Sequence, residues 1–385
     1  MLRSAEIPAA VTRAATDAGF ELVGIAPVED APELEHFPQW IAAGHAGEMK
    51  YLEARDEQGR LKRASLAHAA PWARSVIVCA LNYNTAQPYS TQMTDAARGW
   101  ISRYAWGRED YHESVMRRLR QVEAAVKRAA GADVVTRCYV DTGPIVERVV
   151  AKYAGVGWIG KNTCIINEKL GSWLFLGVIL TSLDLTRDLA SLPAPDRCGS
   201  CTRCIDACPT EAFIAPYQLD SNKCISYLTI EKRGALPEDD ELRSGMGRHV
   251  FGCDICQDVC PWNRKAPATA AAEFQARDEL LNPALEWLAE ISAEEFNRTF
   301  RESPVRRAKR AGFRRNAVIA MGNSGDRKFL PLLEKLISDE DGVVGESADW
   351  ARRKLLDPDQ KNHRSIWIKY LESTTYVACD LPESG

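Results

Sequence analysis

The sequence predicts a mixed helix–sheet protein of the α/β or α+β class with three parts. These are an N-terminal α/β domain over residues 1–190, a cysteine-rich module over 191–265 and a helical domain over 266–385. Helix and strand patterns alternate before residue 190, eight cysteines cluster between Cys198 and Cys260, and the sequence beyond is helical and basic. A length of 385 residues suits two or three domains.

The N-terminal part carries the periodicities of both helices and strands. Apolar residues recur at Val115, Leu119, Val122 and Val126, which is the spacing of one helix face. Val76–Leu81 is an unbroken apolar, β-branched run that predicts a buried strand. The predicted helices are Ile7–Ala18, Tyr111–Ala130 and Ile145–Tyr153, and the predicted strands are Leu22–Ile25, Val76–Leu81, Val134–Val140 and, as a strand or hairpin, Ser172–Ser182.

The C-terminal part begins after a linker at Leu192–Pro195, where two prolines in four residues stop both helix and sheet. Phe313–Ala320 and Phe329–Ile337 predict two helices, and Trp350–Leu356 continues the pattern. A helical pair of about 40 residues resembles a HEAT-type repeat, so a HEAT-like domain is expected. The final residues carry few structural signals and predict a poorly ordered tail.

Composition narrows the class of protein. A net charge of -4 excludes a uniformly basic nucleic-acid binder but allows a local basic patch. No stretch approaches the ~20 apolar residues that span a bilayer, and no leader pattern opens the sequence. We therefore expect a cytoplasmic protein without membrane contact. In that compartment twelve cysteines are more often metal ligands than disulfides.

The cysteine spacing predicts two iron–sulfur clusters in a ferredoxin-like module. Cys198-x2-Cys201-x2-Cys204-x3-Cys208-Pro matches the bacterial ferredoxin run, in which the fourth cysteine completes the other cluster. A second set comprises Cys224 and Cys253-x2-Cys256-x3-Cys260-Pro. The first [4Fe–4S] cluster is thus assigned Cys198, Cys201, Cys204 and Cys260, and the second Cys208, Cys224, Cys253 and Cys256.

Zinc is the alternative for paired cysteines, although two Cys-Pro endings fit it poorly. Cys79, Cys138 and Cys164 lie outside the pattern and are interpreted as packing residues. Clusters with four thiolates per cube only transfer electrons, so the N-terminal domain must supply a cofactor or an active site. The glycine-rich run Gly155–Lys161 lacks phosphate-loop spacing and indicates tight turns.

Several strings coincide with this cysteine pattern. They are Ile101-Ser-Arg-Tyr-Ala-Trp-Gly-Arg-Glu-Asp-Tyr-His112, Val140-Asp-Thr-Gly-Pro-Ile-Val-Glu-Arg148, Gly157-Trp-Ile-Gly-Lys-Asn162, Cys224-Ile-Ser-Tyr-Leu-Thr-Ile-Glu231 and Arg315-Asn-Ala-Val-Ile-Ala-Met-Gly-Asn323. Together they resemble the epoxyqueuosine reductases, over most of the chain.

The resemblance implies a cobalamin-dependent enzyme that reduces the epoxide of epoxyqueuosine at the wobble position of tRNA, giving queuosine. Cobalamin would lie between the N-terminal domain and the cluster module. A cluster, fed by an external low-potential electron donor, would reduce it to cob(I)alamin.

The resemblance also assigns residues. Asp141 matches the family's proton donor, which needs a raised pKa, and burial beneath the corrin would raise it. From spacing alone Asp141 is typical of a helix N-cap. Arg63, Tyr104, Asp141, Ile165, Ser226 and Asp254 match cofactor contacts, and Lys232 and Arg233 match a segment near the tRNA. His112 is interpreted as a surface or packing residue, and Glu147 with Arg148 as a structural ion pair.

Arg306, Arg310 and Arg314 belong to a basic segment that is either a solvated helix face or a phosphate-binding patch. The resemblance favours tRNA binding there. Two alternatives stay open for the whole chain. One is a reductive dehalogenase-like cobalamin enzyme, and the other is a non-enzymatic electron carrier, which would have no need of residues 1–190.

Overall fold

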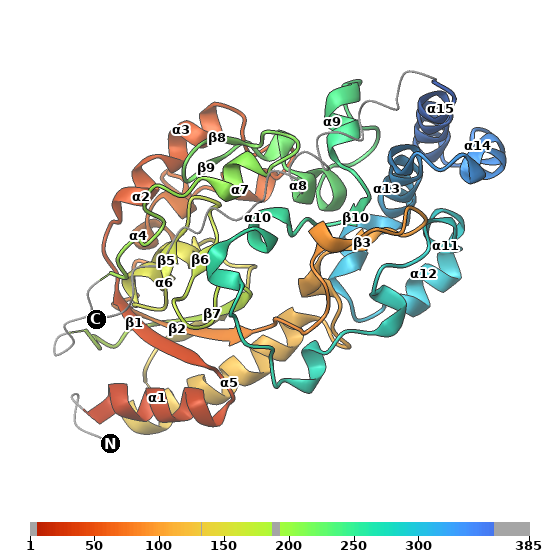
Figure 1. The fold of residues 1–385 in the computed structure, drawn as a ribbon. Coiled ribbons are helices and arrows are strands. Elements are labelled where there is room, and N and C mark those ends of the chain that lie inside the picture. The colour runs from red at the N-terminus through yellow and green to blue at the C-terminus, as the bar shows by residue number, and fades with distance from the viewer. Residues whose placement is uncertain (1–5, 132, 187–192, 358–385) are drawn as a thin grey trace.

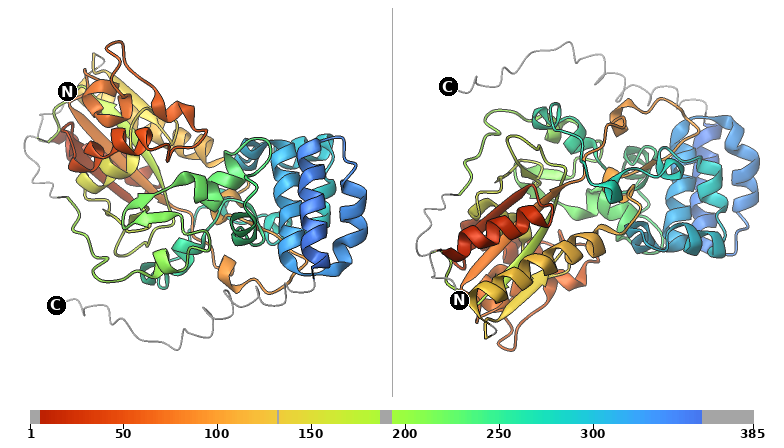
Figure 2. Two further views of the ribbon diagram at one scale, coloured as in Figure 1. Left: turned by 90° about the horizontal axis from the view of Figure 1, so that it is seen from above. Right: turned by 90° about the horizontal axis from the view of Figure 1, so that it is seen from below.

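The computed structural model describes residues 6–131, 133–186 and 193–357. Leu192 of the predicted linker and the predicted tail beyond residue 357 lie outside this range. A sheet with its covering helices forms one end of the molecule, and a group of helices forms the other (Figures 1 and 2). The cysteine-bearing segments lie between them (Figure 1).

The sheet has the order β1-β2-β7-β4, and each neighbouring pair is antiparallel. Its strands are β1 (Leu22–Pro27), β2 (Ser75–Asn82), β7 (Leu174–Thr181) and β4 (Thr136–Tyr139). The α/β prediction for this domain is therefore corrected to α+β, because helix–strand alternation suggested parallel strands and the strands are antiparallel.

Both faces of the sheet are covered, which explains the unbroken apolar run in β2. Ile77 and Cys79 face a core formed with α1 (Ile7–Asp17) and α5 (Tyr111–Ala130). Val76 and Val78 face a second core formed with α6 (Glu147–Tyr153). Figure 2 shows α1 and α5 side by side on one face of the sheet.

The connection between β4 and α6 departs from the predicted ranges. The strand ends at Tyr139 and the helix begins only at Glu147, so residues 140–146 form a loop. Asp141 in this loop has φ of 54°, a left-handed conformation that is uncommon outside glycine. The candidate proton donor Asp141 therefore lies within a loop, neither in β4 nor at the start of α6.

A short parallel pairing joins distant parts of the chain. β3 (Trp100–Ile101) pairs with β10 (His249–Phe251). Trp100 and Trp106 lie in the same hydrophobic core as the C-terminal helices. A segment of the predicted N-terminal domain is therefore packed against the rest of the molecule.

The helical end is built around α13 (Lys309–Ser324), whose residues Phe313–Gly322 are all buried. It packs against α15 (Gly342–Leu356), and a Cβ on Gly322 would come within 2.9 Å of Ala351. The three predicted helices are present, although α15 begins at Gly342, well before Trp350, with Asp341 as its N-cap. The HEAT-type assignment stays a prediction.

The remaining elements are short. They are α2 (Pro32–Glu35), α3 (Phe37–Ala42), α4 (Leu66–Ala69), β5 (Trp158–Ile159), β6 (Ile165–Ile166), α7 (Arg203–Asp206), β8 (Phe213–Ala215), β9 (Gln218–Leu219), α8 (Ile225–Ile230), α9 (Asp240–Gly245), α10 (Ile255–Asp258), α11 (Leu285–Glu290), α12 (Ala293–Thr299) and α14 (Leu330–Leu336). Across the described residues, every helix is too short or too polar to cross a bilayer.

Candidate active site and cluster-binding module

The eight patterned cysteines form two groups of interacting thiols. Burial, together with the nearby Cys201 and Cys198, raises the pKa of Cys204 to about 11. Burial likewise raises the pKa of Cys260 to about 12, with Cys198 and Cys204 as neighbours. The first group therefore contains the four cysteines of the predicted first cluster.

The second group gathers the other four. Burial raises the pKa of Cys224, with Cys208 beside it, and that of Cys253, with Cys224 and Cys208 beside it. Cys256 interacts with Cys253 and Cys224. Among the described residues no three His, Cys, Asp or Glu side chains converge as ligands of a single ion.

The string Gly157–Asn162 lies between the two groups of thiols. Lys161 Nζ donates to the carbonyl oxygens of Gly199 (2.6 Å) and Cys201 (3.0 Å). Asn162 Nδ2 donates to the Cys256 carbonyl at 3.3 Å. Lys161 and Asn162 therefore connect the β5–β6 hairpin to the loop that holds Cys201 and to the segment that holds Cys256.

The Trp158 indole nitrogen is buried and has no nitrogen or oxygen partner. Burial raises the pKa of the Cys198 thiol, but the Lys161 backbone N–H and this indole N–H both favour the thiolate. An N–H group directed at sulfur is the kind of contact that tunes iron–sulfur clusters.

Cys164 differs from its predicted role as a packing residue. Its side chain interacts with that of Cys256, and this contact is the main reason that the pKa of Cys256 is raised. A fifth thiol therefore lies beside the second group. Sequence spacing gave no signal of this contact, because Cys164 is far from the cysteine run.

Asp141 lies open to solvent, with 61% of its side chain accessible. It is not a helix N-cap, since α6 is capped by Val146 without a side-chain bond. Tyr111 Oη donates to Asp141 Oδ2 at 3.0 Å, and His112 Nε2 lies 3.8 Å from the same oxygen.

The neighbours of Asp141 lower its pKa in this structure. Desolvation acts to raise the pKa of Asp141, but the His112 contact, the Tyr111 hydroxyl and Arg307 hold it below its ordinary value. An imidazolium and a hydroxyl both favour the carboxylate, and the raised pKa expected beneath a corrin stays a prediction.

His112 is part of this site and is not simply a packing residue. Its Nδ1 lies 2.7 Å from Asp110 Oδ1, and Asp110 also caps α5 by accepting from the His112 backbone N–H. Burial acts to lower the pKa of His112, but the contacts with Asp110 and Asp141 raise it to about 9. The imidazole is therefore protonated at neutral pH.

Glu147 and Arg148 do not form the predicted ion pair. Arg148 NH1 donates to the carbonyl and hydroxyl oxygens of Thr163. Glu147 Oε1 is buried without a hydrogen-bond partner. Burial raises the pKa of Glu147 to about 7, and the negative charge of Asp141 acts in the same direction.

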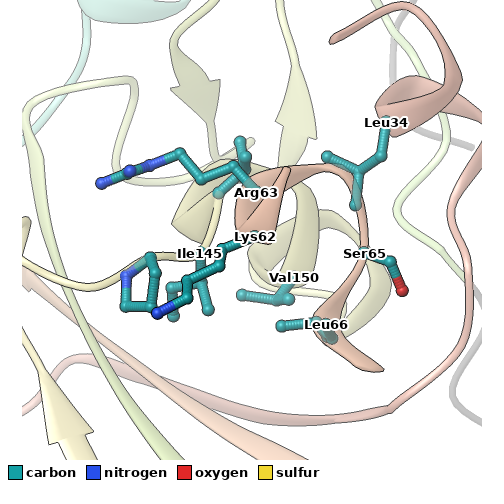
Figure 3. A pocket seen from close by; sticks show the side chains of 9 residues that line it. Leu34, Lys62, Arg63, Ser65, Leu66, Ile145 and Val150 are labelled. Carbon is teal, nitrogen blue, oxygen red and sulfur yellow. The ribbon is translucent and has the colours of Figure 1, made fainter. Parts of the chain in front are cut away.

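Arg63 is buried and supports the Asp141 loop. Its guanidinium donates to the carbonyl oxygens of Gly143 and Tyr51, both at 2.7 Å. Beside it, Leu66, Ile145 and Val150 line a cavity of about 10 Å³, room for roughly one water molecule (Figure 3). This cavity is too small for a substrate.

The other predicted cofactor contacts lie around the second group of thiols. Ile165 follows Cys164 and is buried, and Ser226 lies at the start of α8, two residues after Cys224. Tyr104 is partly buried, and burial, Asp141 and Asp254 all raise its pKa. Tyr104 thus lies between the candidate proton donor and the Cys253 segment.

The Asp254 side chain is already fully bonded. It is 1% exposed and accepts from Trp100 Nε1 (3.0 Å), the Ser102 hydroxyl and the Arg103 backbone N–H (2.8 Å). It connects β3 to the loop after β10, and a cofactor contact by Asp254 stays a prediction.

The predicted tRNA residues have different surroundings. Lys232 pairs with Glu48, and Arg233 NH2 donates to the Arg307 carbonyl at 2.7 Å. Arg306 is exposed, whereas Arg310 is partly buried and donates to the Ile291 carbonyl.

Arg314 lies in the interior, only 4% exposed, and is paired with Asp339. The prediction that Arg314 contacts phosphate is therefore wrong, because the face of α13 that bears it points into the core.

One residue near Asp141 had no sequence signal. The Tyr51 ring is 45% exposed, and the guanidinium groups of Arg307 and Arg63 lie 5.4 and 5.7 Å from its centroid. Arg307 also pairs with Glu231 at 2.5 Å. These side chains link the Asp141 site to the start of the helical end.

Two family models match parts of the chain. The model described as "4Fe-4S double cluster binding domain" matches residues 197–263. The model described as "Epoxyqueuosine reductase QueG, DUF1730" matches residues 63–142. The first match favours iron–sulfur over zinc in the cysteine-rich module.

Curated relatives and solved structures resemble the chain over most of its length. The epoxyqueuosine reductase of Pseudomonas aeruginosa is 40% identical, with 87% of this chain and 91% of the relative covered. That of Synechocystis sp. is 43% identical, with 77% and 98% covered. A crystal structure of selenomethionine-labelled epoxyqueuosine reductase is similar at a TM-score of 0.82 and 30% identity, covering 96% and 95%.

Another structure shows an epoxyqueuosine reductase with a tRNA-Tyr epoxyqueuosine-modified stem loop. It is similar at a TM-score of 0.81 and 29% identity, covering 97% of this chain and 96% of that one. These likenesses extend from the sheet to the last described helices. The chain therefore belongs to the epoxyqueuosine reductase family.

Proposed function

We propose that this chain reduces epoxyqueuosine to queuosine in tRNA, using electrons that pass through two [4Fe–4S] clusters to a cobalamin. One observation carries the proposal. Ring contacts connect the exposed Asp141 to the segment that holds Cys253: Tyr111 donates to Asp141, and Tyr104 lies 5.9 Å from both the Tyr111 and the Phe251 ring centroids. The proposed proton donor and the proposed electron source are thus joined by two aromatic side chains.

The cluster ligands are proposed as the crossed sets. Cys198, Cys201, Cys204 and Cys260 hold the first cluster, and Cys208, Cys224, Cys253 and Cys256 hold the second. The grouping of the thiols supports this assignment. The Trp158 and Lys161 N–H groups directed at Cys198 are suited to a cluster thiolate.

Cobalamin is proposed to bind between Asp141 and the second group of thiols. Ile165 and Ser226 border that group, and Tyr104 adds an aromatic wall. When bound, cobalamin supplies a strongly reducing, nucleophilic cobalt centre for the epoxide. Arg63 acts indirectly, by holding Gly143 and therefore the loop that presents Asp141.

Asp141 is proposed as the group that protonates the epoxide oxygen. The two contacts that it receives both fall on Oδ2, which leaves Oδ1 toward solvent and substrate. The Bacillus subtilis epoxyqueuosine reductase, 30% identical with a TM-score of 0.80, has been seen with its catalytic aspartate loop swung out of the active site. The left-handed Asp141 loop is suited to the same role.

The proposed tRNA surface uses Lys232, Arg233, Arg306 and Arg310, beside the exposed Tyr51 and Arg307. Cationic side chains bind phosphate, and exposed aromatic rings stack on unpaired bases of an anticodon loop. The proposed parts are a cobalamin-binding domain (1–190), a cluster module (191–265) and a HEAT-like tRNA-binding domain (266–385). The setting is cytoplasmic, with an external low-potential electron donor.

The test is reconstitution. Protein loaded anaerobically with iron, sulfide and cobalamin is given a low-potential reductant and a stem loop bearing epoxyqueuosine. Mass analysis of the digested RNA should show queuosine, with omission of cobalamin abolishing it. Turnover without cobalamin, or no turnover in protein with both clusters and a corrin spectrum, would contradict the proposal.

A further inference from the structure

The proposed reaction needs more protons than one carboxylic acid holds. Removing an epoxide oxygen as water breaks both C–O bonds and forms a C=C bond. It consumes two electrons, which the reduced cofactor of the proposed function supplies, and two protons. Asp141 is ionised at neutral pH, because His112, Tyr111 and Arg307 hold its pKa below the ordinary value, so each proton that it passes to the substrate has to come from a neighbouring group.

The geometry around Asp141 offers a path by which a proton can reach its carboxylate. His112 Nδ1 lies 2.7 Å from Asp110 Oδ1, and His112 Nε2 lies 3.8 Å from Asp141 Oδ2. Asp110 is fixed because it caps α5, and the imidazole stacks on Tyr111 with 4.0 Å between ring centroids. With Nδ1–H bonded to Asp110, the Nε2–H points toward Asp141. A carboxylate that fixes one ring nitrogen commonly sets the role of the other.

We propose that His112 is the proton store of this site and supplies protons to the epoxide oxygen through Asp141. The inference rests on the proposed function. The proton moves from His112 Nε2 to Asp141 Oδ2 and on to the strongly basic oxygen left by C–O cleavage, leaving a neutral imidazole whose Nδ1–H stays on Asp110. The basic oxygen drives this transfer, because an imidazolium with a pKa of about 9 does not by itself protonate a carboxylate of lowered pKa. Because a quarter of the His112 side chain is exposed, water restores the imidazolium. Asp141 touches the substrate, and His112 acts through it as a positioning residue.

The surrounding charges keep the His112 imidazole protonated at neutral pH. Asp110 and Asp141 favour the imidazolium and raise the pKa of His112 to about 9. Arg307 and Arg63 are the cations facing Asp141, and Glu147 adds a further carboxyl group beside it. Tyr51, Tyr104 and Tyr111 complete the surroundings as neutral phenols.

The first test titrates the imidazole by NMR in full-length protein before loading with cofactors, with His112→Gln used to assign the signal. His112 should titrate near pH 9, and Asp110→Asn and Asp141→Asn should each lower that value. Titration near the ordinary pKa of ~6.5 in the parent, or no response to Asp141→Asn, would overturn the proposal. This measurement is independent of turnover, so it separates failure of the proton store from failure of the proposed function.

The second test follows turnover against pH in reconstituted protein. His112→Gln should lower kcat about 10²-fold with KM within a few-fold, since one positioned proton donor contributes roughly 10²–10⁴-fold. Asp110→Asn keeps the N-cap, because asparagine caps as well as aspartate, and should move the alkaline fall in activity to lower pH.

Glu109→Gln is the matched control. It removes the neighbouring carboxylate, which pairs with Arg117 on the surface, and should leave the profile unchanged. If Asp110→Asn slows turnover but its alkaline fall stays at the parent's pH, the contact is only structural and the proposal is wrong.

Discussion

Arg314 and Asp339 form a bidentate ion pair inside the helical end, with NH1–Oδ1 and NH2–Oδ2 distances of 2.9 and 2.6 Å. Arg314 Nε also donates to the Ala289 carbonyl at 2.6 Å. The pair therefore joins α13 to the end of α11 and to the turn before α15. Arg314, which the sequence suggests as a phosphate ligand, instead connects three segments inside the protein.

Arg314→Met is expected to destabilise the protein by about 3–5 kcal/mol, because the largely buried Asp339 carboxylate loses the guanidinium that neutralises it and keeps only the Asp341 backbone N–H. The hydrogen bond from Arg314 holds the pKa of Asp339 below its ordinary value. A depressed carboxylate pKa stabilises the fold above the unfolded value near 3.9 and loses that effect as pH falls through the folded value. Thermal unfolding should therefore show a gap between parent and variant at pH 7 that narrows below about pH 4, with Arg306→Met as the neutral control.

Arg306→Glu is expected to weaken binding of a tRNA stem loop without destabilising the protein, because the side chain is exposed. Loss of one phosphate contact lowers the slope of log affinity against log salt by roughly 0.7–0.9. Fluorescence anisotropy over a salt series measures it. An unchanged slope would show that Arg306 is only a solvated side chain.

Cys201→Ser and Cys256→Ser are expected to deplete different clusters, since their thiols belong to different groups. Low-temperature electron paramagnetic resonance and iron analysis distinguish the two signals. Cys138→Ser is the control, because Cys138 is buried in the sheet core far from the pattern. Loss of the same signal in both variants would exclude the crossed ligand sets. Cys164 lies against Cys256, so Cys256→Ser combined with Cys164→Ser should lose more of the second cluster than Cys256→Ser alone.

Asp141→Asn is expected to keep both clusters and the corrin spectrum and to lose turnover by roughly 10²–10⁴-fold. Asparagine preserves the shape and accepts from Tyr111 Oη but has no carboxyl proton to give. Single-turnover assays on the modified stem loop measure the loss. Turnover within a few-fold of the parent would show that another group is the proton donor.

Glu147→Gln is expected to stabilise the protein at pH 8 and to change little at pH 4. Burial raises the pKa of Glu147 to about 7, above the ordinary value near 4.3. Folding therefore opposes ionisation, and the resulting loss of stability grows between these two values and is complete above pH 7. Thermal midpoints at the two pH values test this, with exposed Glu35→Gln as control. Equal shifts at both pH values would mean that Glu147 does not titrate between them.

The sequence was most informative where a local pattern determines the structure. The stripe through Val115, Leu119 and Val122 predicted α5 with its observed ends, and the cysteine spacing predicted two groups of thiols. It was least informative about which side of an element faces inward. Arg306, Arg310 and Arg314 are spaced as one helical face, yet Arg306 is exposed and Arg314 is buried.

Contacts between distant residues also had no sequence signal. Nothing near Trp100 indicates that its indole donates to Asp254 across 154 positions. Likewise, His112 sits in a basic helix, and its contact with Asp141 depends on how the loop after β4 folds back. Patterns of period two or 3.6 describe single elements, whereas such pairings depend on tertiary packing.

The β3–β10 pairing also affects how the protein folds during its synthesis. Most of the hydrophobic core that holds Trp100 and Trp106 comes from residues 225–355, so both side chains remain largely uncovered when the first half of the polypeptide has left the ribosome. At roughly 5–20 residues per second, that interval lasts on the order of ten seconds or more. A truncated chain ending before β10 should therefore expose two tryptophans and bind chaperones or aggregate, whereas the complete chain buries both.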